Sequence, residues 1–479
     1  MNSDLLSDAP LLAAWLSYTS RGVTPFTIPG HKGAAGRLWP ALGSVLAGDV
    51  PLFGGLDSVK LSAGVLRDAE GRAARLWGGD WCRFSTGGST HANQALAMAV
   101  APPGSQVLVS RCAHRSTLLG LVMAGLAPVW LPPTVDGRFG VPREVPDTAL
   151  RAALARHPAA RAVFLVEPSY LGTVSDLPAL VASAHAAGLP VVVDQAWGGH
   201  FGFHPALPGH ALARGADALV TSAHKTLPAY SQASLIVART ERLDPHRLDR
   251  AFDAGNTTSP AGAILASIDG ARALLSARGA ELLDPLIAMV ARARERLRAV
   301  PGVLVPGPED FPAGRFDPAK LVVVVAGSGA SGIDVERDLL HADVPVEMAD
   351  QDTVVPVVTL ADTGTTVERL VEVLCAAILR HSGAPRPLAI APQWTVGAAA
   401  AMAPRDAFFA DHETVPSAAA VGRICAEVVA PYPPGVPVLV PGEVVTADVL
   451  GALRALREAG TRIAYAADPG LDTLQVVAG

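Results

Sequence analysis

The amino-acid sequence predicts an α/β protein whose largest domain is a mostly parallel β-sheet covered by helices on both faces. Between residues 70 and 240, short apolar runs alternate with stretches rich in alanine and leucine, a pattern typical of βαβ units. Apolar runs of this kind are expected of strands that are buried on both faces. We predict strands at Gln106–Val109, Ala162–Val166, Pro190–Val193, Ala218–Val220 and Leu235–Ala238, and a helix at Leu177–Ala187.

The segments on either side of this sheet differ in composition. Residues 1–50 are rich in glycine, proline and isolated aromatic residues, which predicts an arm with one short helix near Leu11–Tyr18. After the last predicted strand, Ser259 is placed to cap a helix and Pro260 to occupy its first turn. We therefore predict a long helix that begins there and continues through Arg272.

A second unit follows residue 300. Its predicted elements are a strand at Leu321–Val325, a helix at Ile333–His341, strands near Val344–Met348 and Val354–Leu360, and a helix at Val367–Arg380. The order β-α-β-β-α predicts a small two-layer domain. Residues 382–387 have the composition of a linker. The predicted division is an arm at 1–50, a large domain at 51–300, a small α/β domain at 301–382 and a C-terminal domain at 383–479.

Composition and charge restrict the partners and the compartment. The chain carries 38 basic and 44 acidic side chains and no basic run, so a nucleic-acid partner is not expected. Its cysteines, at positions 82, 112, 375 and 425, form no C-x-x-C pair, which argues against a metal site or disulfides and fits a reducing cytoplasm. No signal peptide is apparent, and no apolar stretch reaches the roughly 20 residues of a membrane span. We expect a cytoplasmic protein whose partner is a small molecule or a second copy of itself.

Lysine is rare in this chain, and one lysine follows a predicted strand. Only four of the 38 basic residues are lysines, and Lys225 lies in the segment Ser222–Thr226. A chain that uses arginine almost everywhere is expected to keep a lysine where the amine must lose its proton, because guanidinium stays protonated and is a poor nucleophile. Lys225 is therefore a candidate for Schiff-base formation with a carbonyl group. A solvated loop lysine is the ordinary alternative.

A glycine-rich loop lies at the start of another predicted helix. Gly87 and Gly88 are followed by Ser89 and Thr90, and the helical stretch Gln94–Val100 comes next. Glycines allow close approach, hydroxyls bind oxygen, and a helix N-terminus favours an anion, so this loop could hold a phosphate group. A plain turn with a helix cap has the same composition.

Three more side chains follow the carboxyl ends of predicted strands, where open α/β sheets bind ligands. Asp194 ends the run Pro190–Val193 and could hold a proton on a ring nitrogen, or could make an ordinary buried hydrogen bond. His114 could stack on a planar ring, although a lone histidine is more often structural. Trp197 is likewise more often a packing residue. An amine, a carboxylate, a flat side chain and an anion site together are what pyridoxal 5'-phosphate requires.

These residues also resemble a known family, the fold type I ornithine/lysine/arginine decarboxylases. The resemblance extends over most of the chain and keeps the family's order. The matching segments are Ile28–Gly33, Gly54–Asp57, Gly88–Thr90, Ala113–Ser116, Asp194–Trp197, Ser222–Thr226, Thr257–Pro260, Ala266–Asp269, Met402–Asp406, Gly422–Ile424 and Tyr432–Pro437.

The resemblance implies an aspartate aminotransferase-like large domain that binds pyridoxal 5'-phosphate, and a decarboxylase-like domain at 383–479. The cofactor would be attached covalently to Lys225, with Asp194 paired to its ring nitrogen. The remaining cofactor contacts would come from both sides of the ring and from around the phosphate. They are Ala196 below the ring, His114 stacked above it, His224 beside the attachment point, Trp197 nearby, and Gly88, Ser89, Thr90 and Ser222 at the phosphate.

Similar enzymes place the active site between two subunits, so the resemblance also implies a homodimer and leaves a higher oligomer open. Ser259 would then reach the phosphate of the neighbouring copy. This chain resembles the short members of the family, which lack an N-terminal wing domain. The implied reaction is decarboxylation of a basic amino acid, lysine, ornithine, arginine or a relative, to the amine and carbon dioxide. Such a lyase would serve polyamine metabolism.

The sequence departs from the family pattern near the expected site. Gly87 stands where asparagine is common, Ala261 and Gly262 replace serine and tyrosine, and Glu167 occupies a position usually held by another polar or basic residue. We interpret the smaller side chains as additional room for a substrate. The candidates for substrate contact are His31, Glu167, Tyr170, Glu347 and Asp350.

Two alternatives remain open at this point. The same frame could carry out another pyridoxal phosphate reaction, such as transamination, aldol cleavage or decarboxylation of an unusual amino acid. Carbon dioxide release without a keto acid would distinguish decarboxylation from transamination. A regulator or inactive partner subunit is a third class, which the presence of Lys225, Asp194 and His114 disfavours.

Overall fold

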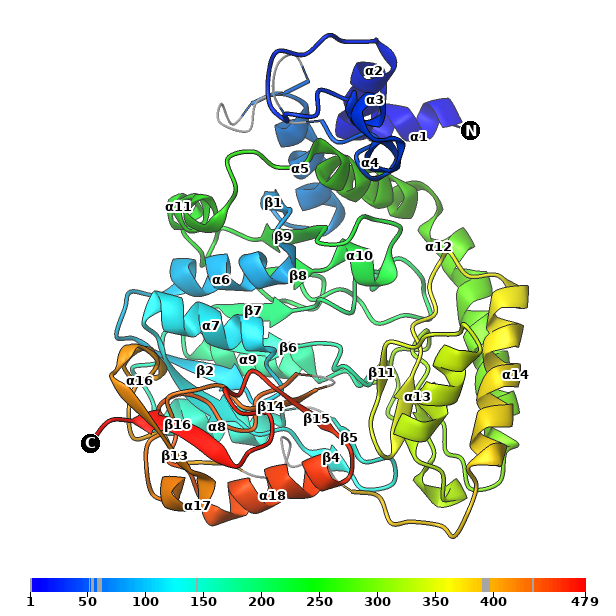
Figure 1. Cartoon of the computed structure of the whole chain (residues 1–479). Coiled ribbons are helices and arrows are strands. Elements are labelled where there is room, and N and C mark those ends of the chain that lie inside the picture. The colour runs from blue at the N-terminus through cyan, green and yellow to red at the C-terminus, as the bar shows by residue number, and fades with distance from the viewer. Residues whose placement is uncertain are drawn as a thin grey trace.

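The computed structural model describes residues 2–50, 52, 56–57, 63–143, 145–389, 397–432 and 435–479. Gly54, Gly55, Pro433 and Pro434, which belong to segments that carry the resemblance, lie outside the described residues, as does Lys60. The arm occupies one end of the molecule in Figure 1. Its helices are α1 (Asn2–Asp8), α2 (Pro10–Ser20), α3 (Ala35–Leu38) and α4 (Pro40–Val45), of which α2 contains the short helix that the sequence predicts.

A seven-stranded sheet forms the centre of the large domain. Its strands are β1 (Trp81–Ser85), β2 (Gln106–Ser110), β3 (Ala127–Leu131), β6 (Val163–Val166), β7 (Val191–Asp194), β8 (Ala218–Thr221) and β9 (Ser234–Ala238). They lie in the order β1-β9-β8-β7-β6-β2-β3, and only β9 runs antiparallel to its neighbours. The prediction of a mostly parallel sheet is confirmed. A short hairpin of β4 (Val135–Asp136) and β5 (Val141–Pro142) lies outside it.

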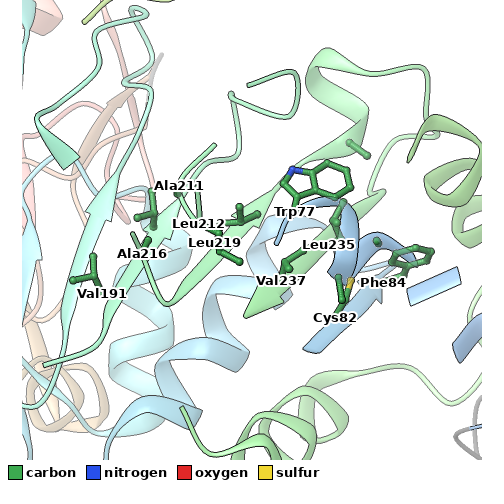
Figure 2. Packing of buried hydrophobic residues seen from close by; sticks show 14 of the residues in the cluster. Trp77, Cys82, Phe84, Val191, Ala211, Leu212, Ala216, Leu219, Leu235 and Val237 are labelled. Carbon is green, nitrogen blue, oxygen red and sulfur yellow. The ribbon is translucent and has the colours of Figure 1, made fainter. Parts of the chain in front are cut away.

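Helices cover both faces of the sheet because successive strand residues point to opposite sides. In β7, Val191 and Val193 pack into one core cluster, whereas Val192 packs into another with Val220 of β8. Figure 2 shows part of the first cluster, in which Trp77 lies among residues of the neighbouring strands. The helices of this domain are α5 (Val65–Leu76), α6 (Gly88–Val100), α7 (Arg115–Ala124), α8 (Asp147–Arg156), α9 (Leu177–Ala186), α10 (Ala223–Thr226) and α11 (Pro245–Gly255).

The long helix α12 (Gly262–Arg298) connects the large domain to the small one (Figure 1). It begins later than predicted: the Ser259 side chain does not cap it, and the first helical amide, that of Gly262, donates to the carbonyl of Val50 at 2.8 Å. The arm therefore supplies the cap that we assigned to serine. The helix also continues past Arg272, with a non-helical residue at Arg278.

The small domain has the predicted β-α-β-β-α order. It consists of β10 (Val323–Val324), α13 (Gly332–His341), β11 (Met348–Ala349), β12 (Thr353–Val355) and α14 (Gly364–Arg380), with strand order β10-β12-β11. The strands are shorter than predicted because Pro345 and Pro356 flank β11 and β12, and proline cannot donate to the strand ladder.

The C-terminal segment has its own core and lies beside α7 and β2 of the large domain (Figure 1). Its elements are α16 (Pro404–Phe409), β13 (His412–Pro416), α17 (Ser417–Ala420), β14 (Ala430–Tyr432), α18 (Ala447–Glu458), β15 (Arg462–Ala464) and β16 (Thr473–Val477). A buried ion pair joins it to the sheet, because Glu443 accepts hydrogen bonds from Arg111 at 2.9 and 3.1 Å. The exact domain boundaries stay a prediction. No helix in the described part of the chain is long and apolar enough to cross a membrane.

Candidate active site

A pocket of about 370 Å³ opens at the carboxyl ends of the central strands. Residues that follow β2, β6, β7 and β8 line it, together with the start of α6 and residues of the small and C-terminal segments. The lining residues are Gly87, Gly88, Ser89, Thr90, His114, Ser116, Val166, Pro168, Tyr170, Asp194, Ala196, Trp197, Ser222, His224, Lys225, Gln232, Glu347, Met348 and Tyr432. The pocket therefore brings together most of the predicted site residues, which were scattered over the sequence.

One wall of the pocket is the N-terminus of α6, where Gly88 has a φ of +67°. This left-handed conformation favours glycine. The hydroxyl of Ser89 lies 2.7 Å from that of Ser222, so both oxygens face the same region. Free amides at a helix N-terminus attract anions. The wall has the chemistry of a phosphate site.

Lys225 and Asp194 reach the pocket from adjacent parallel strands. Asp194 ends β7 and pairs in register with Val220 of β8, a few residues before Lys225. Residues 195–217, between the two strands, form turns. Burial lowers the pKa of the Lys225 ammonium, and the charges of Asp194 and Glu347 oppose that effect. The amine is thus easier to deprotonate than a solvated lysine.

The carboxylate of Asp194 is buried and held in place from two sides. Its Oδ2 accepts a hydrogen bond of 2.7 Å from the side-chain amide of Asn93, and its Oδ1 accepts one of 3.1 Å from the backbone of Ala196. Asn93 lies on α6 one turn beyond the phosphate-binding wall. Asn93 was not among the predicted site residues, although its position in the helix after the glycine loop places it beside the site.

Two histidines border the pocket with their Nδ1 atoms already occupied. His114 caps α7, because its Nδ1 accepts from the backbone amide of Ser116 at 3.2 Å. The Nδ1 of His224 lies 2.8 Å from the carbonyl oxygen of Ala233 and must donate to it. Burial lowers the pKa of both imidazoles. Each ring is therefore predominantly neutral at physiological pH, with Nε2 as its remaining nitrogen.

Of the substrate candidates, Tyr170 and Glu347 line the pocket and Glu167 does not. The Glu167 carboxylate is fully buried, pairs with Arg214 and accepts a hydrogen bond from Ser175. Its backbone amide donates to the carbonyl of Asp194, which extends the pairing of β6 with β7. The prediction of Glu167 as a substrate contact is thus wrong for this pocket, because its buried carboxylate pairs with the partly buried Arg214.

Asp350 and His31 also lie away from this pocket. Asp350 accepts hydrogen bonds from the amides of Asp352 and Thr353 and closes a local turn. His31 pairs with Asp49 at 3.2 Å and lines a different cavity within the arm. Ser259 is exposed and does not line the pocket of its own chain, so a role in a neighbouring copy stays a prediction.

The glycines that depart from the family pattern do not leave empty space. A Cβ atom at Gly87 would lie 2.7 Å from the Cβ of His91, and one at Gly262 would lie 2.6 Å from the carbonyl oxygen of Val50. Neighbouring chain segments already fill both places. Our interpretation of these residues as extra room for a substrate is therefore wrong.

Tyr432 and Lys320 are further residues near the site that the sequence analysis did not select. Tyr432 ends β14 and brings the C-terminal segment into the lining; the segment that begins with it was part of the family resemblance. Lys320 is buried, and its Nζ lies 4.3 Å from the centroid of the Trp197 ring, the same distance as the Nζ of Lys225. The rarity of lysine could have identified it.

The pocket fits pyridoxal 5'-phosphate in both size and chemistry. Its volume of about 370 Å³ is in the range of small-molecule sites. Lys225 supplies an amine of lowered pKa, Asp194 a fixed buried carboxylate, and His114 a neutral flat ring. The start of α6 adds the anion site at the opposite wall.

Comparison with known proteins gives a consistent assignment. The family model described as "Orn/Lys/Arg decarboxylase, major domain" matches residues 9–305, and "Orn/Lys/Arg decarboxylase, C-terminal domain" matches residues 391–472. An arginine decarboxylase of Halalkalibacterium halodurans is 33% identical over 98% of this chain and 97% of its own. One of Bacillus subtilis is 31% identical over 98% of both chains.

Among solved structures, the lysine decarboxylase LdcF of Francisella novicida superposes with a TM-score of 0.81. The sequence identity is 20%, and the superposition covers 98% of this chain and 81% of that one. At this identity the likeness shows the fold alone. It confirms the predicted fold type I architecture.

Proposed function

This chain belongs to the Orn/Lys/Arg decarboxylase family, and we propose that its substrate is arginine or a closely related basic amino acid. The family consists of pyridoxal phosphate-dependent decarboxylases, and this chain is such an enzyme. The arginine assignment is supported by two relatives of that name, each more than 30% identical over nearly the whole chain. The observation that carries the reaction is the meeting of Lys225 and Asp194 in one pocket at the ends of adjacent strands.

We assign the roles of the cofactor-binding residues from their positions. Lys225 would hold the cofactor through its amine, and the buried carboxylate of Asp194 would keep a proton on the ring nitrogen. His114 and Ala196 would hold the two faces of the ring. The hydroxyls and amides at the start of α6, with Ser222, would bind the phosphate.

When bound, pyridoxal phosphate supplies an electron sink that weakens the bonds to the substrate Cα. The pocket would select the bond that breaks by holding the Cα–carboxylate bond of the substrate perpendicular to the plane of the cofactor ring. Tyr170, Trp197 and Met348 line the pocket and would exclude water from the reacting carbon. After carbon dioxide leaves, a proton must return to Cα, and His224 or the freed amine of Lys225 is placed to deliver it.

The distal cation of the substrate would lie at the open side of the pocket. Glu347 of the small domain lines that side, is exposed, and acts electrostatically on Lys225. Tyr432 approaches from the C-terminal segment. A carboxylate beside an aromatic ring suits a guanidinium or ammonium group, through charge and cation–π contact.

We further propose that the working unit is a homodimer. The arm exposes large apolar side chains, with Phe26 at 93%, Leu38 at 88% and Val45 at 78% exposure. Exposed apolar groups gathered on one segment are typical of an interface. Ser259 is also exposed and free to reach a second copy. A cytoplasmic location and a role of the amine product in polyamine metabolism belong to the same proposal.

The test is incubation of the purified chain and cofactor with arginine, lysine and ornithine in separate reactions. We expect carbon dioxide and agmatine from arginine in equal amounts, and no keto acid. A Lys225→Ala protein serves as the control and should release neither. Keto acid without carbon dioxide would instead favour transamination, and release from lysine or ornithine alone would reassign the substrate.

A further inference from the structure

A second lysine stands beside the active site in a cavity of its own. Lys320 lies behind Trp197, in a small cavity of about 20 Å³ that Pro168, Trp197, His200, Thr226 and Asp317 also line. Trp197 and Pro168 line the active-site pocket as well, so they form the wall between the two spaces. A cavity of this size holds about one water molecule.

The backbone and the stem of Lys320 are held in place by their neighbours. Its amide donates to the carbonyl of Asp317 at 3.0 Å, and its own carbonyl accepts from Arg294 at 3.1 Å. Its stem passes over Gly172, where a Cβ atom would lie only 2.7 Å from the lysine Cγ. A glycine with a φ of +88° thus clears the path of this side chain.

The amine of Lys320 comes close to the amine of Lys225. Each Nζ lies 4.3 Å from the centroid of the Trp197 ring, so the two nitrogens are separated by no more than twice that distance. Two positive charges at such a separation, next to a buried ring, repel each other strongly enough to affect protonation. The ring lies within cation–π distance of both.

We propose that Lys320 is a positioning residue whose ammonium, acting beside the Trp197 ring, increases the fraction of the Lys225 amine that is neutral and nucleophilic. The inference rests on the proposed function of Lys225 as the residue that captures the cofactor aldehyde. A neighbouring cation is a recognised means of activating such a lysine. An arginine could not take this place, because the cavity leaves no room for a guanidinium.

The charges around both amines are consistent with this role. Burial lowers the pKa of Lys320 to about 8; Asp317 and Glu347 oppose the shift, and the charge of Lys225 adds to it. The other two titratable groups that line the cavity, His200 and Asp317, are paired with each other at 3.1 Å. Lys320 is therefore still mostly charged at neutral pH.

Around Lys225 the facing groups are Asp194, Glu347 and the two histidines of the pocket. Both acids favour its protonated form, and both imidazoles are neutral at physiological pH. Lys320 is thus the nearby cation able to offset the acids. While Lys320 is charged, its repulsion favours the neutral form of Lys225, because the repulsion by which Lys225 lowers the pKa of Lys320 acts in both directions.

The first test measures the electrostatic coupling between Lys225 and Lys320 in the absence of the cofactor. With lysine labelled at ¹³Cε, the full-length chain freed of cofactor should give separate NMR titrations for its four lysines. In Lys225→Met, the midpoint of Lys320 should rise by about one pH unit, as expected for charges at this separation at an effective dielectric constant near 20. Lys32, exposed in the arm, is the internal control and should not move.

The second test measures how the charge of Lys320 affects the rate of cofactor capture by Lys225. In Lys320→Met, capture of pyridoxal phosphate by the chain, followed by its visible absorbance, should be about tenfold slower at pH 7. The rates of variant and wild type should converge above about pH 9, where Lys320 itself has lost its proton. A merely structural role would slow capture equally at every pH.

Either of two results would overturn the proposal: a Lys320 midpoint that is the same in Lys225→Met and wild type, or capture by Lys320→Met that follows wild type at pH 7. The NMR titration does not depend on catalysis, so it stays decisive if the proposed function fails. Conversely, turnover by Lys225→Ala would refute the proposed function without affecting the coupling.

Discussion

The buried ion pair between Arg111 and Glu443 predicts that one substitution loosens the C-terminal segment from the active site. In Arg111→Met, Glu443 loses the hydrogen bonds of 2.9 and 3.1 Å that it receives from the guanidinium. The two side chains are only 7% and 1% exposed, so the remaining carboxylate cannot be solvated in place. Leaving one partner of such a pair buried and uncompensated costs about 3–5 kcal/mol.

The chain provides a matched control for this prediction. Arg151 pairs with Asp147 at 2.6 Å, but its side chain is 69% exposed. Pairs of that kind contribute about 0–1 kcal/mol, so Arg151→Met should hardly change stability. The double variant Arg111→Met/Glu443→Leu removes both buried charges and should recover most of the loss.

The assay combines urea unfolding with limited proteolysis and steady-state kinetics. Arg111→Met should unfold at lower urea, become sensitive to proteases within residues 397–479, and raise KM, because Tyr432 of that segment lines the pocket. The reasoning is refuted if Arg111→Met is no less stable than Arg151→Met, or if the double variant is less stable than Arg111→Met alone.

Three further predictions concern single acidic residues. Glu347→Gln should raise KM for arginine several-fold with little change in kcat, since its charge would bind the distal cation; an unchanged KM would remove Glu347 from substrate binding. Glu167→Gln should lower the melting temperature and leave KM unchanged, because the buried Glu167 carboxylate pairs with the partly buried Arg214; a selective effect on KM would return it to the site. Burial raises the pKa of Glu70 from 4.5 to about 7, so the folded state binds this proton more tightly than the unfolded state does. The free energy of unfolding of the wild type should therefore fall by roughly 3 kcal/mol as the pH rises from 4.5 to 7. The melting temperature of Glu70→Gln should not show this fall over the same pH range. If the wild type and Glu70→Gln depend on pH in the same way, the raised pKa of Glu70 is contradicted.

The central sheet and the cofactor pocket could be predicted because short stretches of sequence identify both the buried strands and the polar residues at their ends. Continuous apolar runs identify buried strands, and the polar residue that ends each run falls at the same edge of the sheet. Lys225 and Asp194 were found in this way, and the glycine loop was found by its position before a helical stretch. The strands of the small domain, which lie next to prolines, were predicted in the right order but were predicted to be too long.

The misassigned residues share a physical cause, which is that their partners are distant in the chain. Glu167 was assigned to the substrate because no local feature indicates Arg214, 47 positions away. Gly262 was interpreted as empty space, although the carbonyl of Val50 occupies it. Lys320 was overlooked because the segment that carries it becomes part of the active-site wall only when the small domain folds against Trp197.

Sites of covalent attachment can be read directly by mass spectrometry. The purified chain is loaded with pyridoxal phosphate, treated with borohydride to fix the cofactor to the amine that holds it, and digested. We predict that the mass added by the cofactor appears on the peptide containing residue 225 and that Lys225→Ala loses it. Cofactor found on Lys320 or another lysine, or on none, would contradict the account.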